Sequence, residues 1–119
     1  ILVFIQPTSP LVNQNDLNQG IEMVMTNKYD SVFSAYKEHW IPRWTKDIKP
    51  INWETSNRPM RQEVEEEYVE NGAFYITKRD LFLKSHNRYC GNIGIVEMPN
   101  YRSFQVDTLD DLQLIGKLL

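Results

Sequence analysis

The chain has 119 residues, 41% hydrophobic and 24% charged, which are ordinary values for one folded domain with a modest core. Its net charge of −3 argues against nucleic-acid binding, because phosphate recognition requires clustered Lys and Arg. A single cysteine, Cys90, excludes an internal disulfide, and no apolar stretch reaches the length needed to cross a bilayer. We therefore expect a single-domain cytoplasmic protein that binds neither nucleic acid nor membrane.

The chain begins with five apolar residues, Ile1–Ile5, followed by the polar turn Gln6–Pro10. A continuous aliphatic run bounded by turn residues predicts a strand buried on both faces, as in the interior of a parallel sheet. Such a strand needs a neighbour on each side, so we expect the chain to be part of a larger sheet. The turn would lie at the carboxyl end of the strand, where open α/β sheets bind their ligands.

A helix is predicted after this turn, beginning at Asn13–Asn15 and ending at Tyr29–Asp30. Its apolar face is formed by residues at helical spacing, namely Leu17, Ile21, Val24 and Met25. The pattern then predicts a strand over Ser31–Tyr36. A strand, a helix and a strand with short connections favour a parallel sheet with a right-handed crossover.

From Lys37 to Tyr68 the regular pattern stops, and this stretch holds all three tryptophans and three of the six prolines. We interpret residues 37–70 as an arm that leaves the sheet and buries its aromatic side chains against something else. Two surfaces remain open for this contact: the body of the domain and a second copy of the chain. Aromatic residues and Arg are enriched at subunit interfaces, which favours a homodimer.

The last third of the chain predicts strands at Ala73–Ile76 and Ile93–Met98, with a short helix at Arg79–Lys84 between them. A short strand is predicted at Ser103–Val106. Thr108 then begins a final helix, with Asp111 completing a capping box. The buried side of this helix is expected to hold Leu109, Leu112, Ile115 and Leu119.

Two polar clusters offer side chains that could bind an acidic or hydroxylated ligand. In the first turn, two prolines fix the backbone and present Gln6, Thr8 and Ser9. Alternatively, this segment is a simple strand exit whose Thr and Ser cap the next element. In the second cluster, Arg58 and Arg61 flank a proline and could clamp a carboxylate or phosphate. The alternative is that these arginines only offset the acidic stretch that follows them.

Two further clusters lie next to predicted strands. Gly72 permits close approach of the backbone to a ligand and Asn71 tolerates a left-handed turn, although both also suit an ordinary turn. Asp107 stands at the end of a strand, where a carboxylate is a natural Mg²⁺ ligand. Its alternative role is to complement the dipole of the final helix, and for Asp110 and Asp111 we prefer that role.

Taken in order, these clusters resemble the acylneuraminate cytidylyltransferases, the CMP-sialic acid synthetase family. The resemblance extends over nearly the whole chain and rests on five segments: Gln6–Leu11, Tyr29–Ser34, Arg58–Gln62, Tyr68 with Glu70–Ile76, and Ser103–Asp107. It implies an α/β fold in which residues 1–119 form a partial cytidylyltransferase domain. That domain would be an incomplete Rossmann-like nucleotidyltransferase sheet with a projecting dimerisation arm.

The resemblance also implies a reaction. The anomeric hydroxyl of a sialic-acid-like sugar acid attacks the α-phosphate of CTP, with Mg²⁺ bound, and gives a CMP-sugar and pyrophosphate. By the family's motifs, Asp107 would hold Mg²⁺, and Arg61 and Arg43 would reach the substrate across a dimer interface. The residues expected to contact or enclose the sugar are Gln6, Thr8, Ser9, Asn71, Gly72 and Phe74.

The sequence departs from the family pattern in two places. It contains no Gly-, Lys- and Arg-rich loop of the kind that binds the triphosphate in this family, and Gln105 stands where an aspartate is common. One hypothesis is that the chain supplies the sugar-binding and dimer part of an enzyme and is inactive until an N-terminal half supplies CTP binding. The other is that it is a truncated, non-catalytic homologue that acts as a binding or assembly module.

Overall fold

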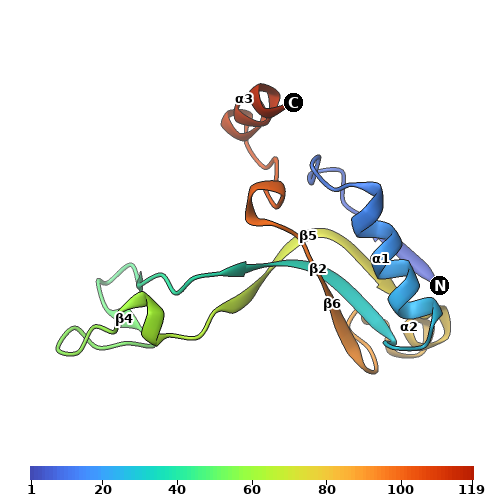
Figure 1. The fold of residues 1–119 in the computed structure, drawn as a ribbon, viewed down its shortest axis with the longest axis horizontal. Helices are drawn as coiled ribbons and strands as arrows, with labels where there is room; N and C mark the ends of the chain where they lie inside the picture. The colour runs from blue at the N-terminus through green and yellow to red at the C-terminus, as the bar shows by residue number, and fades with distance from the viewer.

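The computed structural model describes residues 1–119 as a mixed four-stranded sheet from which one long segment projects (Figure 1). The strands lie in the order β1-β5-β2-β6. Strand β5 is antiparallel to both β1 and β2, whereas β2 and β6 are parallel. The bounds of these strands are β1 Leu2–Ile5, β2 Ser31–Glu38, β5 Glu67–Thr77 and β6 Ile93–Glu97. The α/β class predicted from the sequence is confirmed at this level.

Strand β1 differs from the prediction of a strand buried on both faces. It lies at the edge of the sheet and pairs only with β5, in a register that places Leu2 opposite Thr77 and Ile5 opposite Phe74. Along β1 the half-buried Leu2 and Phe4 alternate with the exposed Val3 and Ile5, which are 39% and 54% exposed, so one face of the strand remains open. The sheet is mixed rather than parallel since β5 lies between β1 and β2. These two strands nevertheless point the same way, because both are antiparallel to β5.

Helix α1 spans Gln14–Met25 and begins as predicted. Asn13 is its N-cap: the side chain accepts a hydrogen bond from the Asp16 backbone N–H, and the Asp16 carboxylate accepts one from the Asn13 N–H. Gly20 brings the helix close to the sheet, where a Cβ would lie only 2.7 Å from Ile76 Cδ1. The prediction that Met25 is buried is wrong, because it sits on the outer side of the last turn.

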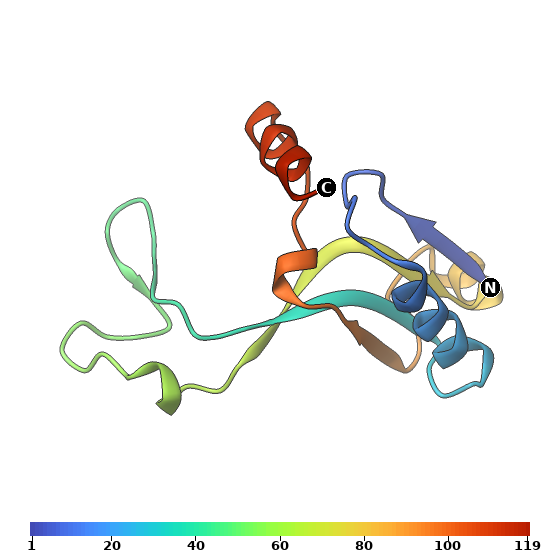
Figure 2. The ribbon, with the colours of Figure 1, turned by 45° about the horizontal axis from the view of Figure 1, so that its top comes forward.

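The core lies between α1 and one face of the sheet, as Figure 2 shows. Helix α1 packs against β2, β5 and β6. The buried cluster comprises Val24, Val32, Ala73, Phe74, Ile76, Val96 and Met98, with Leu17 and Ile21 packed at its edge. This confirms most of the apolar face predicted for the helix.

Strands β2 and β5 continue beyond the core as a two-stranded ribbon that carries the projecting segment, which we call the arm (residues 39–66; Figure 1, left). The arm contains the short strands β3 (Arg43–Trp44) and β4 (Pro50–Ile51), which pair with one another, and the 3₁₀ helix η1 (Arg61–Glu63). A projecting segment was predicted for this region, and its function in dimerisation stays a prediction.

The three tryptophans of the arm pack on one another within a single chain. Trp53 makes edge-on contacts with Trp40 and Trp44, at centroid separations of 6.1 and 4.9 Å. Its indole N–H also donates to the Arg43 carbonyl oxygen. The aromatic side chains are therefore partly buried by each other, an arrangement that neither sequence alternative included. Trp44 is still 47% exposed.

The C-terminal third contains helix α2 (Arg79–Ser85), the 3₁₀ helix η2 (Asn100–Arg102) and helix α3 (Leu109–Leu118). Thr108 and Asp111 form the predicted capping box. On α3 only Ile115 is buried; the expected burial of Leu109, Leu112 and Leu119 is wrong, because α3 stands away from the sheet (Figure 1). None of the helices combines the length and apolar character that a membrane span requires.

Candidate functional site

The prediction of a strand over residues 103–106 is also wrong, and the reason shows how the site is built. This segment, which we call the loop 103–107, has no strand beside it. Its backbone instead bonds to the turn Gln6–Pro10, where the Val106 N–H donates to the Thr8 carbonyl oxygen at 2.8 Å. The turn is held to β5 in the same way, by the Gln6 N–H donating to the Ala73 carbonyl oxygen at 3.0 Å. Turn, strand and loop thus meet at one place.

At this meeting point β5 contains a bulge. Phe33 of β2 lies opposite Tyr75, but Ala35, two residues on, lies opposite Glu70, so β5 carries three residues more than β2 in that interval. Gly72 lies inside the bulge with a φ of +70°, a conformation that residues with a Cβ rarely adopt. Bulges re-aim side chains and are common beside active sites. The sequence signal was Asn71-Gly72, which predicts either a close approach of the backbone to a ligand or an ordinary turn.

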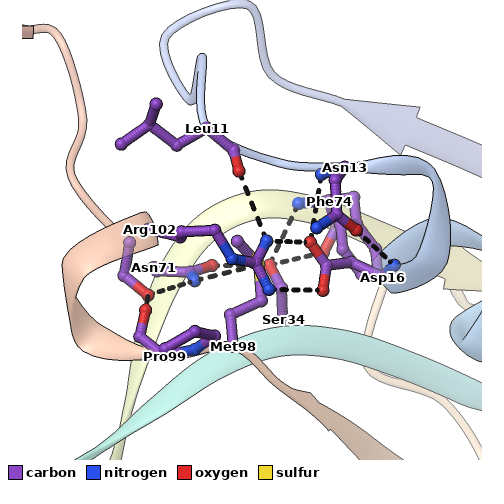
Figure 3. Close-up of polar contacts among 10 residues, drawn as sticks. Leu11, Asn13, Asp16, Ser34, Asn71, Phe74, Met98, Pro99 and Arg102 are labelled. Atoms are coloured by element: carbon purple, nitrogen blue, oxygen red, sulfur yellow. Dashed lines mark hydrogen bonds and ion pairs between the residues drawn. The ribbon is translucent and has the colours of Figure 1, made fainter. Parts of the chain in front are cut away.

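The Asn71 side chain holds the bulge together from inside (Figure 3). Its Oδ1 accepts hydrogen bonds from Ser34 Oγ at 2.6 Å and from the Ala73 N–H at 3.2 Å. Its Nδ2 donates to Ser103 Oγ at 3.0 Å and to Met98 Sδ at 3.4 Å. All hydrogen-bonding positions of this buried amide are filled within the chain. Asn71 therefore fixes the backbone of the bulge and ties it to the start of the loop 103–107.

Gly72 is enclosed by two glutamine side chains that come from the turn and from the loop. A Cβ built on Gly72 would lie 2.4 Å from Gln105 Nε2 and 3.2 Å from Gln6 Oε1. Gln105 Nε2 also donates a hydrogen bond to the Asn71 carbonyl oxygen. An aspartate at position 105 has no N–H with which to make this bond. Gln105 thus contributes a structural contact that an aspartate could not.

Ser9 is the one buried polar side chain without a hydrogen-bond partner. The residue is 6% exposed, and its Oγ has no hydrogen-bond partner, whereas its backbone N–H donates to the Gln6 carbonyl oxygen. Leaving a buried hydroxyl unpaired costs about 1–3 kcal/mol. Most side-chain polar groups of folded proteins avoid that cost. The Ser9 hydroxyl thus keeps an unused donor and acceptor within the turn.

A cleft of about 340 Å³ opens beside the bulge. Its lining residues come from β2, β5, η2, the loop 103–107 and α3: Tyr36, Glu70, Asn71, Asn100, Ser103, Phe104, Gln105, Asp107 and Asp111. Two of its carboxylates are already engaged. Glu70 accepts hydrogen bonds from the hydroxyls of Tyr75 and Tyr89, and the pKa of Tyr75 is raised, first by burial and then by Glu70. The Asp111 carboxylate accepts from the backbone N–H groups of Asp107 and Thr108.

Asp107 is the cleft carboxylate that remains free. It is exposed, and its carboxylate has no hydrogen bond or ion pair within the chain. The structure contains no group of three or more acidic, His or Cys side chains arranged to hold a metal ion. A Mg²⁺ ion at Asp107 would therefore take its other ligands from water and substrate phosphates, which is how Mg²⁺ is usually bound. The donor set fits that mode of binding.

Acidification should disturb the backbone of Asp107. Hydrogen bonds to the Asp111 carboxylate lower its pKa below the ordinary value of 3.8, and the bond from the Asp107 N–H has the largest effect. Their stabilising effect is complete above that value and is lost as the pH falls through the lowered pKa. We expect the amide resonances of Asp107 and Thr108 to shift together with the Asp111 carboxyl in an NMR titration below pH about 4. Asp111→Asn should remove the shared transition, and its persistence would contradict this assignment.

Two predicted site residues lie elsewhere in the chain. Arg43 is on the arm, where its Nη2 donates to Glu38 Oε2 at 2.7 Å. Arg61 lines a hollow of about 280 Å³ at the far end of the molecule, together with Trp40, Pro42, Arg58, Pro59 and Met60. Neither arginine lines the cleft beside the bulge. A single chain therefore does not bring them together with Asp107.

Phe74 is placed differently from the rest of the predicted sugar pocket. Its side chain is 0% exposed and belongs to the core beneath Gly20. Direct contact with a ligand would require the core to open. Conversely, sequence reasoning did not select Glu70 or Tyr36, which line the cleft. Glu70 belongs to a run of acidic residues, and such runs usually form solvated surfaces; its two tyrosine partners are five and nineteen residues away.

Curated proteins resemble parts of this sequence, whereas no family model matches it. N-acylneuraminate cytidylyltransferase A from Danio rerio is 34% identical over 88 residues, which are 68% of this chain and 20% of that protein. The N-acylneuraminate cytidylyltransferase of Oncorhynchus mykiss is 36% identical over 86 residues, or 66% of this chain and 20% of that protein. A Campylobacter coli protein named post-translational flagellin modification protein B is 25% identical over 122 aligned positions, covering 99% of this chain and 52% of itself. The chain therefore spans about a fifth of the two fish relatives and about half of the bacterial one.

Proposed function

Because the chain is homologous to part of the N-acylneuraminate cytidylyltransferases, we propose that it supplies the sugar-acid site of a cytidylyltransferase. The reaction would transfer CMP from CTP to a sialic-acid-like nonulosonic acid and release pyrophosphate. This chain would provide the sugar-binding and dimer part. Binding of CTP would depend on a nucleotide-binding half that lies outside these 119 residues.

The observation that carries the proposal is the meeting of three segments at the bulge of β5. The turn with Gln6 and Ser9, the backbone of Gly72, and the loop that ends at Asp107 lie around one place. They supply the Gln6 amide, the unpaired Ser9 hydroxyl and the free Asp107 carboxylate, of which Asp107 lines the cleft. A sugar acid with several hydroxyls requires such closely spaced donors and acceptors, because specific sites hold polar ligands through a few convergent groups.

Asp107 is the residue that would hold Mg²⁺ in this proposal. When bound, the ion would neutralise phosphate charge and orient the reacting groups. Asp107 suits this role because it is the one cleft carboxylate with no partner within the chain. The Gln105 amide would meanwhile hold the Asn71 carbonyl, so the site would operate with one carboxylate at this place rather than two.

The arm is proposed to complete the site in a homodimer. Arg61 and Arg58 make no ion pair within the chain and flank a hollow rather than the cleft. Two free arginines beside Trp40 and Met60 would suit an acidic group or a partner surface. In a homodimer the arm of one copy would bring Arg61, and also Arg43, to the cleft of the other.

Titration of the protein with N-acetylneuraminate, followed by NMR, tests the sugar site. We expect amide shifts at Gln6, Ser9 and Gly72 and no shifts in α2. Ser9→Ala should weaken binding while leaving the free energy of unfolding unchanged or higher, because the hydroxyl has no partner to lose. Ser85→Ala on α2 is the matched control, since its hydroxyl only bonds nearby backbone.

A second assay separates the enzyme from the alternative. The chain is joined to a nucleotide-binding half from a relative, and Mg²⁺-dependent formation of CMP-N-acetylneuraminate is measured. Product formation supports the cytidylyltransferase. Sugar binding without product, although the added half binds CTP, would instead support the truncated, non-catalytic binding module. If neither binding nor product is observed with any nonulosonic acid, the proposal is wrong.

A further inference from the structure

We infer that Arg102 and Asp16 form a positioning ion pair that fixes the loop 103–107, which lines the cleft, against the turn Gln6–Pro10 and the start of α1. The effect of the pair on ligand binding rests on the proposed function, whereas its effect on the position of the loop does not. Arg102 Nη2 donates to Asp16 Oδ1 at 3.0 Å, Nη1 donates to Asp16 Oδ2, and Nη1 also donates to the Leu11 carbonyl oxygen at 3.3 Å (Figure 3). The guanidinium thus makes a bidentate contact with the carboxylate, which we call the fork, and a third hydrogen bond to the backbone.

The pair is shielded from solvent. The side chain of Asp16 is 8% exposed and that of Arg102 is 21% exposed. Asp16 raises the pKa of Arg102 through the hydrogen bonds, which is the direction expected for a cation that its partner stabilises. Removal of one member of such a pair leaves an uncompensated charge in a poorly solvated place. The contact is therefore stronger than an ordinary surface ion pair, whose effect is small.

The positions of these residues in the chain give the pair its effect on the site. Arg102 ends η2 and directly precedes the loop 103–107, which leads to Asp107. Leu11 directly follows the turn that carries Ser9, and Asp16 lies in the first turn of α1. A rigid link between these points fixes the loop that ends at Asp107, a residue of the cleft, against the turn that carries Ser9.

Other contacts tie the loop to the turn and to the bulge, but they are neutral hydrogen bonds. In these bonds the Val106 N–H donates to the Thr8 carbonyl oxygen, the Gln105 amide donates to the Asn71 carbonyl oxygen, and Asn71 Nδ2 donates to Ser103 Oγ. The loop has no strand neighbour and no ladder of backbone bonds. Because charged hydrogen bonds are roughly twice as strong as neutral ones, the fork is the strongest tie at this end of the loop.

Amide hydrogen exchange tests the inference without any ligand. The Val106 N–H, which joins the loop to the Thr8 carbonyl oxygen of the turn, reports on the contact between loop and turn. We expect Arg102→Met to raise the exchange rate of the Val106 amide by a factor at least about ten times the factor for core amides in β2. A loss of roughly 1.4 kcal/mol of local stability corresponds to such a tenfold change. Arg102→Lys, which keeps the charge but loses the fork, should fall between wild type and Arg102→Met. Asp16→Asn, which keeps an oxygen for the helix cap, should behave like Arg102→Met.

A matched ion pair at the other end of the sheet provides the control. Lys78 Nζ lies 2.8 Å from Asp30 Oδ1, and the two side chains are 31% and 29% exposed. Lys78→Met should affect amides near that pair and leave the ratio of Val106 to core exchange unchanged. Should Arg102→Lys and Arg102→Met raise exchange at Val106 no more than in the core, the pair only stabilises the fold and the inference is overturned.

The same variants separate this inference from the proposed function. Arg102→Lys and Arg102→Met should weaken N-acetylneuraminate binding in the order of their effect on Val106 exchange. If the wild-type protein binds no sugar acid, the proposed function fails, yet the exchange rates still decide whether the pair positions the loop. If binding is normal in variants whose loop has loosened, the loop is positioned by the pair but is not needed for the sugar.

Discussion

Gly72→Ala is expected to destabilise the protein by about 1–3 kcal/mol and to abolish binding at the cleft. Two effects combine. The φ of +70° is unfavourable for alanine, and the new methyl group would lie 2.4 Å from Gln105 Nε2. The glutamine end can move, but only by releasing the Asn71 carbonyl oxygen that it holds. The free energy of unfolding, from urea denaturation, and the sugar titration measure the two effects.

Gly116→Ala is the matched control for this experiment. Gly116 lies within α3, and a Cβ there would meet nothing within 4 Å. Alanine in a helix interior is favoured over glycine by about 1 kcal/mol, so this variant should be slightly more stable than wild type and bind normally. If Gly72→Ala also proved neutral, the bulge would not have the conformation described here.

Asp107→Asn is expected to lower CMP transfer by about 100-fold or more in the completed enzyme, because a metal supplies several kcal/mol of transition-state stabilisation. Asparagine keeps the shape of the side chain and removes its charge. The backbone N–H of residue 107, which bonds to Asp111, is unchanged, so the cap of α3 should persist. The dependence of the rate on Mg²⁺ concentration is the measurement, and it should move to higher concentrations.

Asp110→Asn is the control for the loss of charge. Asp110 is one of the acidic residues in the first turn of α3, but it does not line the cleft. We expect normal rates and a normal Mg²⁺ dependence. Equal losses in the two variants would indicate a general effect of charge rather than a metal ligand at Asp107.

The elements that the sequence predicts well are those set by local chemistry. Asn13 and Asp16 define the start of α1, and Thr108 and Asp111 define the start of α3, because a capping box needs only residues three apart. The bulge could be recognised only as a turn at Asn71-Gly72. Its geometry depends on Ser34, which reaches it from another strand. A partner 37 residues away leaves no periodic signal in the sequence.

The errors have a common physical origin in long-range pairing. The apolar run of β1 is compatible with an interior or an edge position, and only the pairing with β5 decides between them. The segment at Ser103–Val106 has strand-like residues, but its backbone bonds to the Thr8 turn instead of a strand. The Arg102–Asp16 pair joins residues 86 positions apart, so no local pattern in the sequence predicts the contact.

The ribbon of β2 and β5 has a mechanical consequence. The two strands run unbroken from the core into the base of the arm, and neither contains a proline. Gly72 is the only glycine in either strand, and it lies in the bulge beside the cleft. The arm is therefore a lever whose strand β5 passes through the bulge beside the cleft. A displacement of the arm would be transmitted along β5 to the residues around Gly72.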